Sequence, residues 1–150
     1  MKVELTLNGR SATLEARTDE MLLAVLRREG LLSVRETCGI GMCGACTVLV
    51  DGEPVSGCLM LAVQAAGREV TTVEGLGGAG GHPVQRAIAE AHGFQCGWCT
   101  PGFVLAAKRL LELKDGEPLT DEDIAAGLGG NLCRCGSYLK IAEGVRRCAS

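Results

Sequence analysis

The number and spacing of the cysteines constrain this chain more than any other feature of its sequence. Nine of the 150 residues are cysteine, and eight of these fall into two groups, one in each half of the chain. Polar and apolar residues alternate from Lys2 to Leu7, unlike the layout of a signal peptide, so we expect a soluble, cytoplasmic protein. Disulfides are rare in that reducing compartment, and clustered cysteines there more often bind metal or do redox work. We therefore expect a fold built around metal centres.

The first half of the chain, residues 1–75, is expected to form a small α+β domain. Apolar and polar residues alternate on both sides of Asn8-Gly9, a dipeptide typical of a two-residue hairpin turn. Thr18 can cap a following helix, which Gly30 would end. The remaining predicted elements are strands over residues 47–50 and 69–73 and a second hairpin turn at Asp51-Gly52.

The second half is expected to be helical. Residues 76–81 are rich in glycine and predict a flexible linker. No strand pattern follows in residues 82–150, which instead carry helix-start signals. The four expected helices begin at Pro83, at Thr100-Pro101, after a capping box formed by Thr120 and Asp123, and at Ser137.

The first group of cysteines matches the loop of plant-type [2Fe–2S] ferredoxins, in which a Cys-x4-Cys-x2-Cys segment is completed by a distant fourth cysteine. Its members are Cys38, Cys43, Cys46 and Cys58. Glycines inside the loop allow positive φ and a close approach of the backbone, so that N–H groups can point at the cluster sulfurs. These glycines are Gly39, Gly41 and Gly44. A structural zinc site is the alternative, although zinc usually uses two Cys-x2-Cys pairs.

The second group of cysteines is less specific when its spacing is taken alone. Cys96 and Cys99 precede one predicted helix, and Cys133 and Cys135 precede the last one. Two helix N-termini would then face one point, where their partial positive charges favour an anionic cluster. Zinc or a redox dithiol would also fit this spacing. Trp98, between two of these cysteines, is expected to shield the cluster or to line an electron route.

Longer segments around the cysteines resemble a known family. The segments are Gln95-Cys-Gly-Trp-Cys-Thr-Pro-Gly102, Gly130-Asn-Leu-Cys-Arg-Cys135 and Cys38-Gly-Ile-Gly-Met-Cys-Gly-Ala-Cys46, the last followed by Thr47-Val-Leu-Val50. Together they are similar to the iron–sulfur subunit of the xanthine oxidase family of molybdenum hydroxylases. The resemblance covers almost the whole chain and includes both cysteine groups in order.

This resemblance implies a plant-ferredoxin-like β-grasp domain followed by a four-helix domain, with one [2Fe–2S] cluster in each. It implies that the chain is the electron-transfer subunit of a molybdenum-dependent oxidoreductase and carries no substrate site itself. The partners implied are a large molybdopterin-binding subunit and a medium FAD-binding subunit, in a hetero-oligomer such as a dimer of heterotrimers. Gln95 matches the glutamine that hydrogen-bonds the pterin beside the second cluster.

Two features bear on the choice of partner and on alternative functions. Gly136-Ser137-Tyr138 replaces the Thr-Gly-Tyr of many family members, and this variant resembles members that pass electrons to acceptors other than a flavin subunit. The alternatives are a free-standing two-cluster ferredoxin and a zinc-stabilised interaction module.

The net charge is −3 with acidic and basic residues mixed, which indicates no nucleic-acid partner. No apolar run approaches the roughly 20 residues of a membrane helix, so no membrane insertion is expected.

Overall fold

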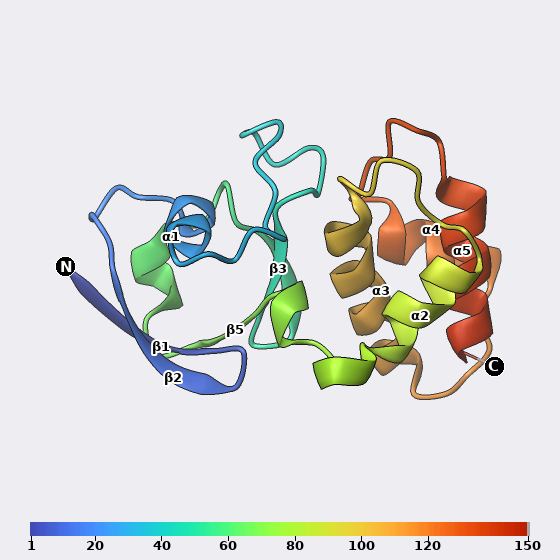
Figure 1. The fold of residues 1–150 in the computed structure, drawn as a ribbon, viewed down its shortest axis with the longest axis horizontal. Coiled ribbons are helices and arrows are strands. Elements are labelled where there is room, and N and C mark those ends of the chain that lie inside the picture. Colours follow the sequence, from blue (N-terminus) through green and yellow to red (C-terminus); the bar gives the residue numbers. More distant parts are fainter. Residues whose placement is uncertain (150) are drawn as a thin grey trace.

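The computed structural model describes residues 1–149 and consists of a sheet-containing half beside a helical half (Figure 1). The first half contains β1 (Lys2–Leu7), β2 (Arg10–Glu15), α1 (Leu22–Arg28), β3 (Thr47–Val50), β4 (Glu53–Ser56) and β5 (Glu69–Thr71). The second contains α2 (Pro83–Glu90), α3 (Thr100–Lys114), α4 (Asp121–Leu128) and α5 (Tyr138–Ala149). Short 3-10 turns are η1 (Ala62–Ala65), η2 (Val73–Gly75) and η3 (Gly78–Gly80). The α+β class predicted from the sequence is confirmed.

The five strands form one mixed sheet in the order β2-β1-β5-β3-β4. β1 and β2 are antiparallel and joined by Asn8 and Gly9, both with positive φ, as a two-residue hairpin turn requires. β5 is parallel to β1 and antiparallel to β3. The apolar side chains of α1 pack with those of the sheet in a first hydrophobic core.

Strand β3 is buried along its whole length because it is covered on both faces. Val48 and Val50 belong to the first core, whereas Leu49 points the other way and belongs to a second core. That second core is formed mainly by the four helices, and α3 lies beside β3 (Figure 1). The two halves therefore share a strand, since successive side chains of a strand face opposite sides of the sheet.

Two predicted boundaries in the first half are wrong. Helix α1 begins at Leu22 rather than after Thr18, and no side chain caps it. Its first N–H groups instead donate to carbonyl groups of a distant segment, Leu22 to Met60 O at 2.8 Å and Leu23 to Gly57 O at 2.9 Å. A tertiary contact thus satisfies donors that a local cap would otherwise satisfy.

Strand β5 ends at Thr71, two residues earlier than the sequence predicts. The side chain of Asn8 accepts from the Thr72 N–H at 2.8 Å and donates to the Thr72 hydroxyl at 3.1 Å. The chain then turns into η2. The Asn8 side chain therefore takes the hydrogen bonds that would have extended the sheet.

The helical half begins where the sequence predicts. Pro83 is the first residue of α2, and Thr120 and Asp123 form the expected capping box at α4. The glycine-rich segment before α2 is folded into tight turns, and the Arg86 guanidinium donates to the carbonyls of Gly80 and Gly81.

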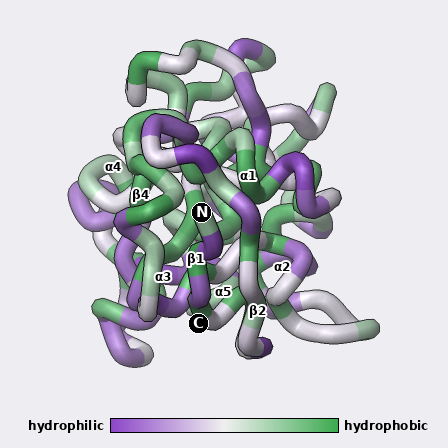
Figure 2. Tube along the Cα trace, turned by 90° about the vertical axis from the view of Figure 1, so that its left-hand side faces the viewer, coloured by the Kyte–Doolittle hydropathy of each residue, from purple (hydrophilic) through white to green (hydrophobic). Residues whose placement is uncertain are grey.

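Hydrophobic and hydrophilic segments alternate along the chain rather than forming one long apolar stretch (Figure 2). Within residues 1–149, no helix has the length and apolar composition needed to cross a membrane.

Candidate metal centres

The first group of cysteines lies on an irregular loop between α1 and β3 and on the turn after β4. The loop glycines Gly39, Gly41 and Gly44 have φ values of +67°, +76° and +68°, which side-chain-bearing residues rarely adopt. The four thiols lie as two pairs, in which Cys43 affects the ionisation of Cys38 and Cys58 affects that of Cys46. The first pair is partly exposed and the second is buried.

Backbone and burial give the thiols of this group opposite acidities. The N–H of Ile40, followed by the Cys43 thiol, lowers the pKa of Cys38 to about 6. Burial raises the pKa of Cys46 to about 11. Metal ligands must be thiolates, so Cys38 is ready to bind a metal at neutral pH, whereas Cys46 must release a proton when metal binds.

The second group of cysteines lies on the loops that precede α3 and α5. Its thiols also form two pairs, Cys96 with Cys135 and Cys99 with Cys133. The pairing joins segments more than thirty residues apart in the sequence. The Cys133 N–H donates to the Tyr138 hydroxyl at 2.8 Å, which fastens this loop to the first turn of α5.

The acidities in the second group follow the same physical causes. The backbone N–H of Trp98 is the main cause of a lowered pKa at Cys96. Burial raises the pKa of Cys99 to about 12. Burial opposes ionisation of Cys133, yet the Ser137 N–H, 3.4 Å from its sulfur, contributes to a pKa that is lowered overall. Each group thus combines a thiol whose pKa is lowered, Cys38 or Cys96, with one whose pKa is raised by burial, Cys46 or Cys99.

The donor set fits a two-iron cluster in each half. A [2Fe–2S] cluster takes four thiolates, two on each iron, and each group offers two pairs of thiols. Among residues 1–149, no three His, Cys, Asp or Glu side chains are grouped as a single ion would need. Backbone N–H groups that lower the pKa of the thiols, such as those of Ile40 and Trp98, are also suited to the negative sulfurs of a cluster.

Both groups lie on loops at the same end of the molecule, at the top of Figure 1, because the two halves pack closely there. The buried Asn131 side chain donates to Gly44 O at 2.9 Å, and the Leu132 N–H donates to Cys43 O at 2.9 Å. A Cβ atom on Gly102 would lie 2.3 Å from Gly44 O, so this approach requires glycine.

Four side chains at this junction make contacts across it that the sequence does not predict. Asn131 falls inside the segment that carried the family resemblance, but its partner, 87 residues away, has no local signal. Trp98 reaches across to Thr37 and packs against Arg35. Nothing in the sequence around Thr37 or Arg35 predicts these contacts.

Gln95, the predicted pterin contact, is exposed beside the second group. Its side-chain amide donates to the Cys135 carbonyl at 3.3 Å. Gln95 therefore lies at the surface next to a predicted ligand.

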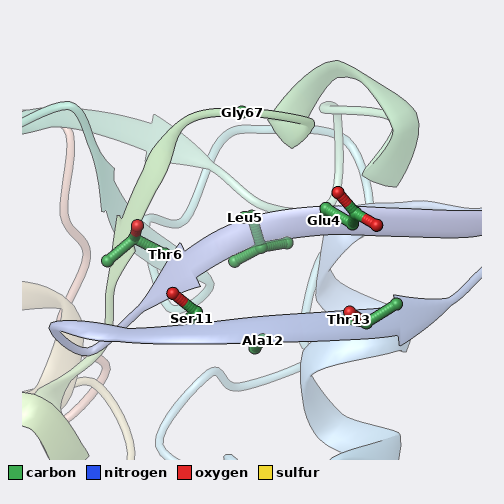
Figure 3. Close-up of a pocket in the computed structure, with 7 residues that line it drawn as sticks. All are labelled: Glu4, Leu5, Thr6, Ser11, Ala12, Thr13 and Gly67. Atoms are coloured by element: carbon green, nitrogen blue, oxygen red, sulfur yellow. The ribbon is translucent and has the colours of Figure 1, made fainter.

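A separate hollow of about 340 Å³ lies on the sheet and shares no residue with either cysteine group. It is lined by seven residues of β1, β2 and the turn before β5 (Figure 3): Glu4, Leu5, Thr6, Ser11, Ala12, Thr13 and Gly67. It contains no cysteine, and Glu4 is its only ionisable side chain.

Comparison with known proteins assigns each half to a cluster-binding family. The 2Fe–2S iron–sulfur cluster binding domain matches residues 5–71, and a [2Fe–2S] binding domain matches residues 72–146. The xanthine dehydrogenase iron–sulfur-binding subunit of Escherichia coli O157:H7 is 46% identical over 97% of this chain and 92% of its own length. The chain belongs to the small [2Fe–2S] subunits of the molybdenum hydroxylases. The nicotinate dehydrogenase small FeS subunit of Eubacterium barkeri is likewise 45% identical, over 99% of this chain and 97% of its own length.

Solved structures agree with this assignment to the molybdenum hydroxylase family. The quinoline 2-oxidoreductase structure from Pseudomonas putida 86 matches with a TM-score of 0.92 and 36% identity, covering 99% of this chain and 92% of that chain. The aldehyde oxidoreductase of Desulfovibrio gigas matches with a TM-score of 0.92 and 34% identity, over 99% of this chain but 17% of that longer chain. This molybdenum hydroxylase subunit is an iron–sulfur electron-transfer subunit of oxidoreductase complexes, so the zinc module and the free-standing ferredoxin are set aside.

Proposed function

We propose that this subunit passes single electrons from a molybdopterin centre on a large partner subunit, through two [2Fe–2S] clusters, to a flavin subunit or another acceptor. The observation that carries the proposal is the collection of eight cysteines into two groups, each of two thiol pairs, at one end of the molecule. A [2Fe–2S] cluster supplies one-electron chemistry when it is bound.

The proposed ligands of the first cluster are Cys38, Cys43, Cys46 and Cys58, and those of the second are Cys96, Cys99, Cys133 and Cys135. The chain's own contribution is to hold these thiols in pairs and to direct N–H groups at them. The loop glycines, with their positive φ values, let the backbone wrap closely around the first cluster. Those N–H donors stabilise the added negative charge of a reduced cluster, which raises its reduction potential.

The proposed assignment of one cluster to each half of the chain follows the two hydrophobic cores. Residues 1–75 would form the domain of the first cluster, residues 76–81 the connection, and residues 82–150 the domain of the second. Two separate cores support this division, although β3 contributes Leu49 to the second one. The Gly136-Ser137 variant before Tyr138 leaves both a medium FAD-binding subunit and a different acceptor as partners to be tested.

Low-temperature EPR of the dithionite-reduced protein, with iron and labile sulfide counted on the same sample, tests the cluster assignment. Two distinct [2Fe–2S] signals and about four irons per chain are expected for two plant-type clusters. A silent spectrum, or tightly bound zinc in place of iron, would contradict it. Co-purification with a large molybdenum-containing subunit and an FAD-containing subunit tests the partners.

Gln95 is proposed to contact the pterin on the partner subunit, because it is exposed next to Cys135. Gln95→Ala should leave both cluster spectra and the iron content unchanged while slowing the reduction of the clusters by substrate in the assembled complex. Gln64→Ala, in the 3-10 turn of the other half, is the matched control and should not slow it. Equal rates in the two variants would remove Gln95 from this role.

A further inference from the structure

Trp98 connects the two cysteine groups. It lies in the sequence between Cys96 and Cys99, yet its indole Nε1 donates to the hydroxyl of Thr37 at 2.8 Å. Thr37 directly precedes Cys38. One hydrogen bond therefore joins the loop of the second group to the first residue of the other loop, across 61 positions of the sequence.

The face of the same indole ring contacts a cation from the first half. The guanidinium carbon of Arg35 lies 4.7 Å from the ring centroid, within the range of a cation–π interaction. The Arg35 Nε atom is buried and has no hydrogen-bond partner among residues 1–149, so its guanidinium packs against the ring side rather than extending fully into water. The Arg35 backbone N–H donates to Ala45 O at 3.1 Å, which ties it to the cysteine loop.

Trp98 and Thr37 also line a cavity beside the second group. The cavity has a volume of about 320 Å³. Its lining includes cysteines of both groups, namely Cys43, Cys96, Cys99 and Cys133, as well as Trp98 and Thr37. Trp98 is 44% exposed, so its buried area alone does not account for a tryptophan here. Its contacts with Thr37 and Arg35 give it a role between the two loops.

We propose that Trp98 is a positioning residue, which acts beside the Asn131 and Leu132 hydrogen bonds to hold the two cysteine loops at one separation, through Thr37 and Arg35, and limits the access of water to this cavity. This inference rests on the proposed ligand assignment. In the exchange between clusters, the electron lost by one is gained by the other, and no bond or proton is transferred. The rate of such an exchange depends steeply on separation, so a fixed distance has a direct functional consequence.

The test is pulsed dipolar EPR on the fully reduced, assembled protein, with iron counted on every sample. Trp98→Phe keeps an aromatic face for Arg35 but removes the N–H donor, and Thr37→Val removes the acceptor of the same hydrogen bond. Both variants should broaden the distribution of distances between the clusters. The fraction of molecules outside the wild-type peak should rise about fivefold, the factor that corresponds to the roughly 1 kcal/mol of one hydrogen bond.

Three comparisons make the test specific. The double variant should broaden the distribution no further than either single variant, because both remove one interaction. Thr37→Ser, which keeps the hydroxyl, and Thr13→Val, the same substitution as Thr37→Val but on an exposed position of β2, should match the wild type. Deuterium modulation of the cluster signals in D2O should increase in Trp98→Phe as water enters.

The wild-type distribution in both Trp98→Phe and Thr37→Val, with about four irons per chain still present, would overturn the positioning role and leave the cluster assignment intact. Fewer than two cluster signals in the wild type would instead contradict the proposed function itself.

Discussion

Replacing Gly102 by alanine should separate the two halves of the molecule at their tightest contact. An added Cβ would lie 2.3 Å from the carbonyl oxygen of Gly44 and 2.8 Å from the Asn131 side-chain nitrogen. Real Cβ atoms almost never come within 3.0 Å of another heavy atom, so the Gly44 carbonyl must retreat by most of an ångström. The obstacle is backbone, which cannot rotate away as a side chain can.

Two opposing effects decide how much Gly102→Ala changes the free energy of unfolding. Alanine is favoured over glycine inside a helix by up to about 1 kcal/mol, and Gly102 lies in the first turn of α3. Overpacking a close contact costs about 1–3 kcal/mol, and here it also strains the hydrogen bond from Asn131 to Gly44 O. We expect the steric cost to win, with a net destabilisation of about 1–2 kcal/mol, which lowers the Tm of a chain of this size by about 2–8 °C.

Gly127→Ala is the matched control, because it makes the same change inside α4. The three atoms nearest to its added Cβ would all belong to the Leu110 side chain, with Cδ2 at 2.9 Å and Cβ at 3.2 Å, and none to the backbone. Because a side chain can shift more easily than backbone, this variant should be destabilised less than Gly102→Ala. The assay is thermal unfolding of the cluster-containing protein followed by circular dichroism. Equal Tm values for the two alanine variants would refute the claim that backbone contact limits this position.

Two further predictions concern the second cysteine group and the helical half. Cys96→Ser should lose the second cluster and spare the first, whereas Cys148→Ser, at the cysteine outside both groups, should keep both; EPR and iron content distinguish these outcomes. His82 caps α2, and its Nδ1 accepts from the Val84 N–H at 3.3 Å. Burial lowers the pKa of His82 below its ordinary 6.5, so the folded protein favours the neutral ring. The stability that this cap contributes is therefore present above pH 6.5 and is lost as the pH falls through the lower folded value. His82→Asn, which keeps a capping acceptor at every pH in this range, should lose less Tm on acidification, and a parallel decline in both proteins would contradict the role of the cap.

Local sequence signals predicted most of the elements because their causes are local. Asn8-Gly9 can adopt the positive φ values of its turn without help from elsewhere, and Pro83 and the Thr120–Asp123 box fix helix starts within one turn. Thr18 failed as a cap because the first N–H groups of α1 find carbonyl partners on a segment more than thirty residues away. The residues next to Thr18 in the sequence give no sign of these long-range hydrogen bonds.

The sequence by itself determined the cysteine groups, the glycines that let the first loop wrap closely, and the family to which the chain belongs. Spacing along the chain is sufficient for the first group, because it matches the plant-type loop, whereas the second group needed the longer family segments around it. Only the tertiary structure decided which thiols pair and how the two loops face each other. Asn131 meets Gly44 and Trp98 meets Thr37 across more than sixty positions. Such contacts depend on how two separately built cores pack around β3, which local patterns do not encode.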